Sequence, residues 1–199
     1  MEREDWNRRY LDREHEPPAE PNRFVLAELT ALAPGRALDL GCGMGRNAVW
    51  LAEGGWDVTA VDFSDVAVRR ARRLAARRGV RVEWLRADLR DYAPPEGAFD
   101  LVLLAYVHLP RVERRLVLRR AAAALAPGGT LLAVGHDLRN LTEGWGGPSN
   151  PDVLYTPDDL VADLEGLGIQ RAERVTRTVE TDEGEAEAVD ALVRARRST

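Results

Sequence analysis

The chain lacks lysine, has one cysteine and contains no long hydrophobic run. All 28 of its basic residues are arginines. The single cysteine, Cys42, excludes a disulfide within the chain and argues against a cysteine-based zinc site. The longest fully apolar run, near residues 101–107, is far shorter than the roughly 18 residues that a transmembrane helix needs. The first five residues are mostly charged and predict no secretory signal, so we expect a cytoplasmic protein without a membrane partner.

Charge is unevenly distributed along the 199 residues, whose formal net charge is −5. Nine arginines and three acids lie between residues 64 and 90, whereas eleven acids and three arginines lie between residues 158 and 190. Because the net charge is negative, we interpret the basic segment as a solvated helix face and expect no nucleic-acid partner. At about 150 residues per domain, we expect residues 1–199 to form a single domain. Nothing in the sequence predicts an oligomeric state.

The predicted secondary structure alternates between strands and helices, which is typical of an α/β fold with a mainly parallel sheet. The expected strands are residues 36–40, 57–61, 80–85, 99–105 and 130–135. Two further β-rich runs, residues 170–180 and 186–194, are separated by an acidic turn that predicts a hairpin.

Helix boundaries follow from capping residues, prolines and glycines. Asn22 and Ser64 are expected to cap the helices that follow them. Pro110 fits the first turn of another helix, which we expect to end at the Pro-Gly-Gly of residues 127–129. The residues that this helix is predicted to bury are Val112, Leu116 and Leu125. Residues 4–13 predict an amphipathic helix, and residues 137–157 a long loop of the kind that often carries function.

The most informative segment joins the first predicted strand to the helix after it. It reads Leu-Asp-Leu-Gly-Cys-Gly-Met-Gly-Arg-Asn over residues 38–47. Glycines at such a turn allow a sharp bend and the close approach of a ligand. The helix N-terminus then presents free N–H groups to a carboxylate or phosphate. Asp62, seventeen residues after Gly45, follows the second strand and can accept hydrogen bonds from a ribose diol.

Two details of this segment distinguish between nucleotide-type cofactors. The glycine spacing is G-x-G-x-G rather than the G-x-G-x-x-G of dinucleotide-binding proteins, which argues against a nicotinamide oxidoreductase. Asp39 lies inside the strand just before the turn. Its negative charge would not favour a pyrophosphate, but it would favour a cofactor that carries an ammonium group.

With these motifs in this order, the chain resembles the class I S-adenosylmethionine-dependent methyltransferases. The resemblance covers nearly the whole chain and rests on residues 38–45, 61–64, 86–89, 99–102 and 125–131. It implies a Rossmann-like, seven-stranded, mainly parallel sheet with helices on both faces and a C-terminal antiparallel hairpin. Residues 41–47, 135–137 and 146–148 are similar to the small-molecule branch that includes tellurite-resistance-type enzymes.

The resemblance implies S-adenosylmethionine as the cofactor and S-adenosylhomocysteine as its product. The residues that it assigns to the cofactor are Tyr10, Asp39, Gly41, Cys42, Gly43, Asn47, Asp62, Phe63, Ala87, Asp88, Leu89 and Ala105. Among them, Asp39 would place the ammonium group, Asp62 the ribose and Asp88 the adenine. Residues 1–21 are expected to form a helical lid that brings Tyr10 near the cofactor's carboxylate, or else a helix that only packs on the surface.

The predicted function is transfer of the cofactor's methyl group to a small-molecule acceptor by in-line displacement. The sulfonium is already a good leaving group, so the protein mainly aligns the reacting atoms. His108 and His136 follow the fourth and fifth strands, at the edge where open α/β sheets bind ligands, and each is a candidate catalytic base. Trp145 and Tyr155 are candidates for the wall of the acceptor pocket, and no metal site is expected. Two alternatives remain: a catalytically silent regulatory protein that binds the cofactor, and an RNA methyltransferase.

Overall fold

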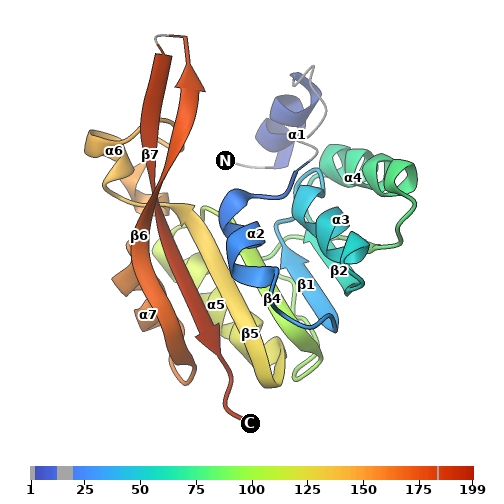
Figure 1. Cartoon of the computed structure of the whole chain (residues 1–199). Coiled ribbons are helices and arrows are strands. Elements are labelled where there is room, and N and C mark those ends of the chain that lie inside the picture. Colours follow the sequence, from blue (N-terminus) through green and yellow to red (C-terminus); the bar gives the residue numbers. More distant parts are fainter. Residues whose placement is uncertain (1–2, 13–19, 183) are drawn as a thin grey trace.

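The computed structural model describes residues 3–12, 20–182 and 184–199 and contains one seven-stranded sheet (Figure 1). The strands are β1 (Arg36–Leu40), β2 (Asp57–Asp62), β3 (Glu83–Arg86), β4 (Phe99–Ala105), β5 (Leu125–His136), β6 (Gly168–Thr181) and β7 (Gly184–Arg196). Their order in the sheet is β3-β2-β1-β4-β5-β7-β6. β1 to β5 pair in parallel, whereas β7 is antiparallel to both β5 and β6. The predicted mainly parallel sheet with a C-terminal antiparallel hairpin is confirmed.

Helices cover both faces of this sheet, as predicted. They are α1 (Arg3–Asp12), α2 (Arg23–Leu29), α3 (Arg46–Glu53), α4 (Asp65–Arg78), α5 (Arg111–Ala124), α6 (Asn140–Glu143) and α7 (Pro157–Asp163), with a short 3-10 helix η1 (Pro151–Val153). One core packs α5 and α7 against side chains such as Leu38 and Val102, and the other packs α2 and α3 against Leu101 and Leu103. Neighbouring residues of β4 thus serve opposite cores, because side chains alternate across a strand.

Local capping chemistry fixes where several helices begin. The Asn22 side chain accepts hydrogen bonds from the backbone N–H groups of Phe24 and Val25, and Ser64 accepts one from Ala67. Both predicted caps are therefore confirmed. In α4 the apolar face is buried, and its arginines are exposed apart from the half-buried Arg70, so the interpretation of a solvated basic face holds.

The predicted buried face of α5 is wrong in two of three positions. Val112 is 83% exposed and Leu116 is 42% exposed. The face that is buried instead consists of Arg114, Val117, Leu118, Ala121 and Ala124. The prediction placed apolar residues inward, but a buried ion pair from Arg114 to Asp163 of α7 sets the rotation of the helix. Leu125 is buried as predicted, although α5 has already ended at Ala124 and Leu125 begins β5.

Several strand boundaries also differ from the prediction, and β5, β6 and β7 are each longer than expected. β3 begins at residue 83 rather than 80, because the Val80 N–H still donates to the Ala75 carbonyl at the end of α4. The predicted loop at residues 137–157 contains α6 and η1, and an isolated β-bridge between Asp137 and Tyr155 joins its two ends.

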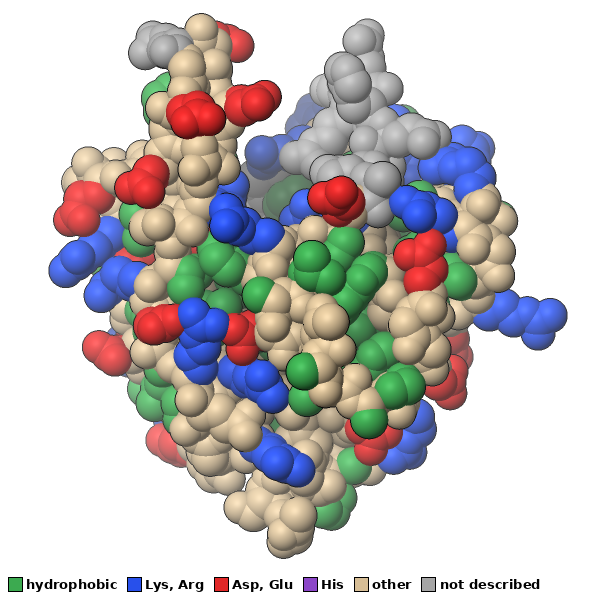
Figure 2. All heavy atoms as spheres, in the orientation of Figure 1, with side chains coloured by type: hydrophobic (Ala, Val, Ile, Leu, Met, Phe, Trp, Pro, Cys, Tyr) green, Lys and Arg blue, Asp and Glu red, His purple; other side chains and the backbone are tan. Residues whose placement is uncertain are grey.

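Charges of one sign gather at two places on the surface. Exposed acids, among them Glu180 and Glu187, line the end of the β6–β7 hairpin that projects beyond the sheet, and arginines lie over α4 on the opposite side (Figure 2). Within the described part of the chain, every helix is too short or too polar to cross a membrane.

Candidate functional site

The glycine turn between β1 and α3 adopts a backbone conformation that favours glycine. Gly41, Gly43 and Gly45 have φ values of 75°, 54° and 85°. The N–H groups of Gly41 and Cys42 both donate to the Val61 carbonyl, at 2.8 and 3.0 Å, so the turn is fixed to the end of β2. A side chain at Gly41 would lie 2.6 Å from a methyl group of Val107. Glycine at position 41 therefore allows the turn to pack closely against Val107.

Asp62 is held rigidly beside this turn. Its Oδ2 accepts from the Gly43 N–H and its Oδ1 from the Ser64 N–H, both at 2.8 Å. The residue is 5% exposed, and burial raises the pKa of its carboxyl group despite these hydrogen bonds. Because each carboxylate oxygen has more than one acceptor site, both oxygens can still accept from a diol.

Asp39 is a buried carboxyl group that the described residues satisfy only in part, since the Ala48 N–H and the charge of Arg46 favour its ionised form but do not outweigh burial. It is 1% exposed, and its Oδ2 has no hydrogen bond among the residues that the structure describes. Burial, with repulsion from Asp62, raises its pKa to about 7. A buried acid of this kind is unusual unless it is paired, and a ligand ammonium group would satisfy it.

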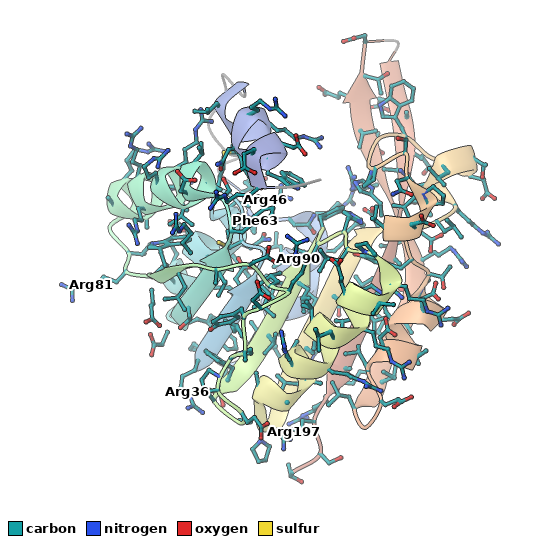
Figure 3. The ribbon with its side chains drawn as sticks, turned by 180° about the vertical axis from the view of Figure 1, so that it is seen from behind. Arg36, Arg46, Phe63, Arg81, Arg90 and Arg197 are labelled. Atoms are coloured by element: carbon teal, nitrogen blue, oxygen red, sulfur yellow. The ribbon has the colours of Figure 1, made fainter. Side chains whose placement is uncertain are left out.

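Two adjoining cavities, of about 740 and 250 Å³, open at the carboxyl ends of the strands. The larger is lined by predicted residues that include Tyr10, Gly41, Cys42, Gly43, Asn47, Ala105, His108 and His136. The smaller is lined by Tyr10, Gly41, Asp62, Phe63, Asp88, Leu89 and His108. In Figure 3, Arg46, Phe63 and Arg90 lie together near this edge of the sheet, whereas Arg36 and Arg197 lie at the opposite end.

Two predicted cofactor residues lie outside the cavity walls. Asp39 is buried beside the turn, and Ala87 packs against the core. The Ala87 N–H donates to the Asp62 carbonyl at 3.2 Å, so Ala87 supports the site through its backbone. At the wall of the smaller cavity, Arg90 binds the Asp88 carboxylate through two nitrogens and lowers its pKa.

Helix α1 lies over the glycine turn. Tyr10 packs with Met44 of the turn and with the first turn of α4, and its ring lies 5.4 Å from that of Trp6. Asn7 accepts a hydrogen bond of 2.6 Å from the Ser64 hydroxyl, next to Asp65. Part of the predicted lid, residues 13–19, lies outside the described residues.

The two predicted catalytic histidines stack on each other, 5.2 Å between ring centroids. His136 Nδ1 lies 3.2 Å from Oδ1 of Asp190, an acid of β7 with no exposed surface. His108 Nδ1 lies 3.2 Å from the Val153 carbonyl oxygen, and its Nε2 is buried without a hydrogen bond to any described residue. Burial, together with its histidine neighbour, lowers the pKa of His108 to about 4.

Sequence reasoning missed the polar residues that the C-terminal hairpin brings to this site. Asp190 Oδ2 accepts from the Tyr106 hydroxyl at 2.6 Å and from Arg177 Nε at 2.8 Å. Asp190 is an acid inside an otherwise apolar run, residues 188–193, and such a residue in a strand is a signal of a buried partner. Tyr106 has φ of 60°, an uncommon conformation without glycine, at the end of β4.

The structure also shows the surroundings of three further residues considered in the sequence analysis. Trp145 is 51% exposed and Tyr155 is buried against His108, so neither of these predicted acceptor contacts lines the two cavities. Burial raises the pKa of the Cys42 thiol well above its usual value. Cys42 is thus a packing residue of the turn rather than an activated nucleophile.

The sheet order, the reversed hairpin and the glycine turn with its acid on β2 define the class I fold of S-adenosylmethionine-dependent methyltransferases. In agreement, residues 37–129 match the family model described as a methyltransferase domain. This match spans a little under half of the chain and agrees with the predicted class and with S-adenosylmethionine as its cofactor.

The chain is similar to two curated proteins and to two solved structures. The demethylmenaquinone methyltransferase of Thermus thermophilus is 38% identical over 104 residues, which are 51% of this chain and 47% of that protein. The ribosomal RNA small subunit methyltransferase C of Alcanivorax borkumensis is 35% identical over 108 residues, which are 52% of this chain and 33% of that protein. The chain thus spans between a third and about half of the length of these relatives.

The solved structures share the fold over most of the chain. One, from work on the conversion of a disulfide bond into a thioacetal group during echinomycin biosynthesis, has a TM-score of 0.81 and 23% identity, and covers 98% of this chain and 91% of that one. TehB from Haemophilus influenzae has a TM-score of 0.72 and 19% identity, and covers 89% of this chain and 63% of that one.

Proposed function

We propose that the protein transfers a methyl group from S-adenosylmethionine to a small-molecule acceptor. The observation that carries this proposal is the Asp62 carboxylate, fixed by the backbone of the glycine turn and exposed to the smaller of two joined cavities. The cavities together offer room for a nucleoside-type cofactor and a second small molecule, since ligand pockets usually span about 300–1,000 Å³. The similarity to demethylmenaquinone methyltransferase supports an acceptor of this kind.

We assign the ribose and adenine of the cofactor to the smaller cavity and its methionyl half to the glycine turn, which lines the larger one. Asp62 would accept the ribose hydroxyls, with Phe63 and Asp88 beside the adenine in the smaller cavity. The turn from Gly41 to Gly45 would hold the methionyl half through its N–H groups, and Asp39 would balance the ammonium group. This arrangement leaves the histidines, at the ends of β4 and β5, for the acceptor side of the larger cavity.

The bound cofactor supplies an electrophilic methyl group on a sulfonium. The chain itself has to align the acceptor and exclude water, which can contribute roughly 7–11 kcal/mol in favourable cases. Helix α1 contributes Trp6, Arg9 and Tyr10 to the wall of the larger cavity, and we propose that it acts as a lid there. The single-domain organisation and the cytoplasmic location stay predictions.

An RNA acceptor is the second candidate, because the relative from Alcanivorax borkumensis is named as a ribosomal RNA methyltransferase. The basic face of α4 supports it less well, since Arg69 and Arg78 pair with acids of this chain. A gel-shift titration with structured RNA distinguishes the two: binding that weakens steeply with salt would favour the RNA acceptor.

The proposal is tested by isothermal titration of S-adenosylhomocysteine into the wild type and the Asp62→Ala variant. Loss of hydrogen bonds to a charged group, each worth about 1.5–3 kcal/mol, should weaken binding at least 100-fold. Asp57→Ala is the matched control, because Asp57 is exposed at the other end of the same strand and should leave binding unchanged. Equal affinity of the wild type and Asp62→Ala would contradict the proposal.

A further inference from the structure

Resting on the proposed function, we propose that His136 is the general base of the reaction and Asp190 its positioning residue. The acceptor would then be a molecule whose attacking atom carries a proton at neutral pH, that is, a hydroxyl, a thiol or an ammonium group. Neither Asp190 nor its partner Arg177 belongs to the motifs of the cofactor site. Both come from the C-terminal hairpin, which reaches the cavity through His136 and Tyr106.

The first step of the argument is the orientation of the His136 ring. Nδ1 lies 3.2 Å from Asp190 Oδ1, and neither of these buried atoms has an aligned hydrogen bond to any other described group. Because an ionised carboxylate only accepts hydrogen bonds, we assign the proton of the neutral ring to Nδ1, the nitrogen that faces Asp190. In the neutral imidazole, the other nitrogen then carries the free lone pair. His136 lines the larger cavity and its side chain is 12% exposed, so Nε2 is the nitrogen offered to an acceptor.

The ring is also held in place from both sides. Tyr106 meets it edge-on, 5.0 Å between centroids, and His108 stacks on it. A side chain at Gly147 would approach the ring atoms to 2.7 Å, so the loop backbone closes over His136. A base held by such contacts needs little reorganisation to accept a proton.

The second step concerns charge. Arg177 lies 2.8 Å from Asp190 Oδ2, and Tyr106 donates to the same oxygen. Although burial opposes it, the contacts with His136, Tyr106 and Arg177 keep the pKa of Asp190 below its usual value. Asp190 therefore stays ionised and can stabilise an imidazolium at His136 without itself taking the proton.

The remaining charged neighbour is neutralised as well. Asp137, which follows His136 in the chain, pairs with Arg174 at 3.0 Å. The tyrosine hydroxyls near the ring, those of Tyr106 and Tyr155, both have raised pKa values because they are buried, and so remain neutral. Asp190 is thus the acid placed to act on the ring.

The third step separates His136 from His108. Both rings lie at the cavity, but within the described residues the Nδ1 of His108 contacts a backbone carbonyl rather than a carboxylate. With its pKa lowered to about 4, His108 is a poor proton acceptor near neutral pH. We assign it to packing against His136 and to contact with the acceptor.

The balance of protons and electrons indicates which kinds of acceptor need a base. Its heteroatom forms a bond to the methyl carbon with a lone pair, and the carbon–sulfur bond breaks with its electron pair left on sulfur. The heteroatom's proton moves to His136 Nε2, so the ring gains the positive charge that the sulfonium loses, and it later releases the proton to water. A thioether has no proton to give and would make this base superfluous.

The deciding experiment is long-range ¹H–¹⁵N NMR of the uniformly labelled full chain, free and saturated with S-adenosylhomocysteine. We expect His136 to be the Nδ1–H tautomer, with Nε2 unprotonated, at pH 7.5. An Nε2–H tautomer in the wild type would overturn the proposal. In Asp190→Asn, where the carboxylate charge is lost, the Nε2–H tautomer of His136 should become populated, whereas His108→Gln, the control from the same stack, should leave the Nδ1–H tautomer dominant. Because the Asp190 variant can lose folding, its circular dichroism is recorded, and the wild-type tautomer decides the question by itself.

Turnover adds a readout that a purely structural role would not change. Benzyl mercaptan remains a thiol at pH 7.5, whereas 4-nitrothiophenol of similar size is already a thiolate. His136→Gln should lower kcat for the first by at least 100-fold, the usual contribution of a general base, and for the second by less than fivefold. Equal losses with both thiols would contradict the proposal. Failure of S-adenosylhomocysteine to bind would instead contradict the proposed function, and the tautomer of the free protein is measured independently of it.

Discussion

At the scale of single residues, the site depends on a carboxyl group that is poorly satisfied without a ligand. Asp39 is buried, and one of its oxygens has no hydrogen bond among the described residues. In the folded protein its pKa is raised from 3.8 to about 7. The folded chain therefore keeps a proton that the unfolded chain releases between about pH 4 and pH 7. The contribution of Asp39 to stability falls as the pH rises through this window and stays low above it.

Replacement of Asp39 by Asn should thus have opposite effects on stability and on ligand binding. We expect Asp39→Asn to melt several degrees higher than the wild type at pH 8, with the difference nearly gone at pH 4.5. The same variant should bind S-adenosylhomocysteine at least tenfold more weakly, because the ammonium group loses its counter-charge. Calorimetric melting across this pH range and titration at pH 8 provide both values. A variant that melts lower than the wild type at pH 8 would be inconsistent with this role of Asp39.

The residues that gather at the site were predictable where a motif at a strand end places them, whereas their roles stay predictions. The glycine turn and Asp62 were found because spacing along the chain is also spacing in space at a strand–turn–helix junction. Arg177 and Asp190 could not be found in this way. They lie far along the chain from Tyr106 and His136, and only the pairing of β5, β6 and β7 brings them together.

At the scale of elements, α1 is the segment that we propose to act as a lid over the cofactor. Its Tyr10 contacts the glycine turn, and its arginines are sites for trypsin. If α1 is a lid, bound S-adenosylhomocysteine should slow cleavage at Arg8 and Arg9 several-fold. Mass spectrometry of the timed digests identifies these cuts.

The corresponding variant is Tyr10→Ala, which should lose this protection and weaken binding about tenfold. Leu11→Ala is the control on the same helix, since Leu11 is 60% exposed, and it should behave like the wild type. Cleavage rates that do not change with ligand in the wild type would contradict a lid.

A second element-scale prediction concerns the contact between α5 and α7. Arg114 and Asp163 pair at 2.8 Å, with side chains 6% and 3% exposed. Removal of one partner leaves a buried charge uncompensated, so Asp163→Ala should lower the free energy of unfolding by about 3–5 kcal/mol. Glu165→Ala breaks the exposed pairs with Arg115 and Arg119 and should cost less than about 1 kcal/mol. Urea unfolding measures the loss of unfolding free energy in both variants. Equal losses would show that burial does not set the strength of these ion pairs.

The same ion pair explains why the sequence misled at α5. Hydrophobic periodicity assigns Val112 and Leu116 to the core and Arg114 to solvent. A buried Arg114 reverses this because its partner lies on α7, about fifty positions away in the sequence. Element types and most boundaries were predictable, since capping residues and glycines act locally, whereas the rotation of a helix depends on tertiary partners.

At the scale of the whole molecule, the strand order explains where the site lies. β1 and β4 are neighbours, and the connection after β1 runs to β2 on one side whereas the connection after β4 runs to β5 on the other, so a crevice opens between their carboxyl ends. The alternation of strands and helices predicted this architecture. The hairpin completes the crevice, because β7 inserts antiparallel between β5 and β6 and carries Asp190 beside His136.

The crystal structure of the full chain with S-adenosylhomocysteine tests the central claim most directly. We expect the ribose hydroxyls within hydrogen-bonding distance of Asp62 and the amino group beside Asp39. The sulfur atom should lie in the larger cavity, on the side of His136. A ligand bound elsewhere, or a crevice that stays closed at saturating ligand, would contradict the account.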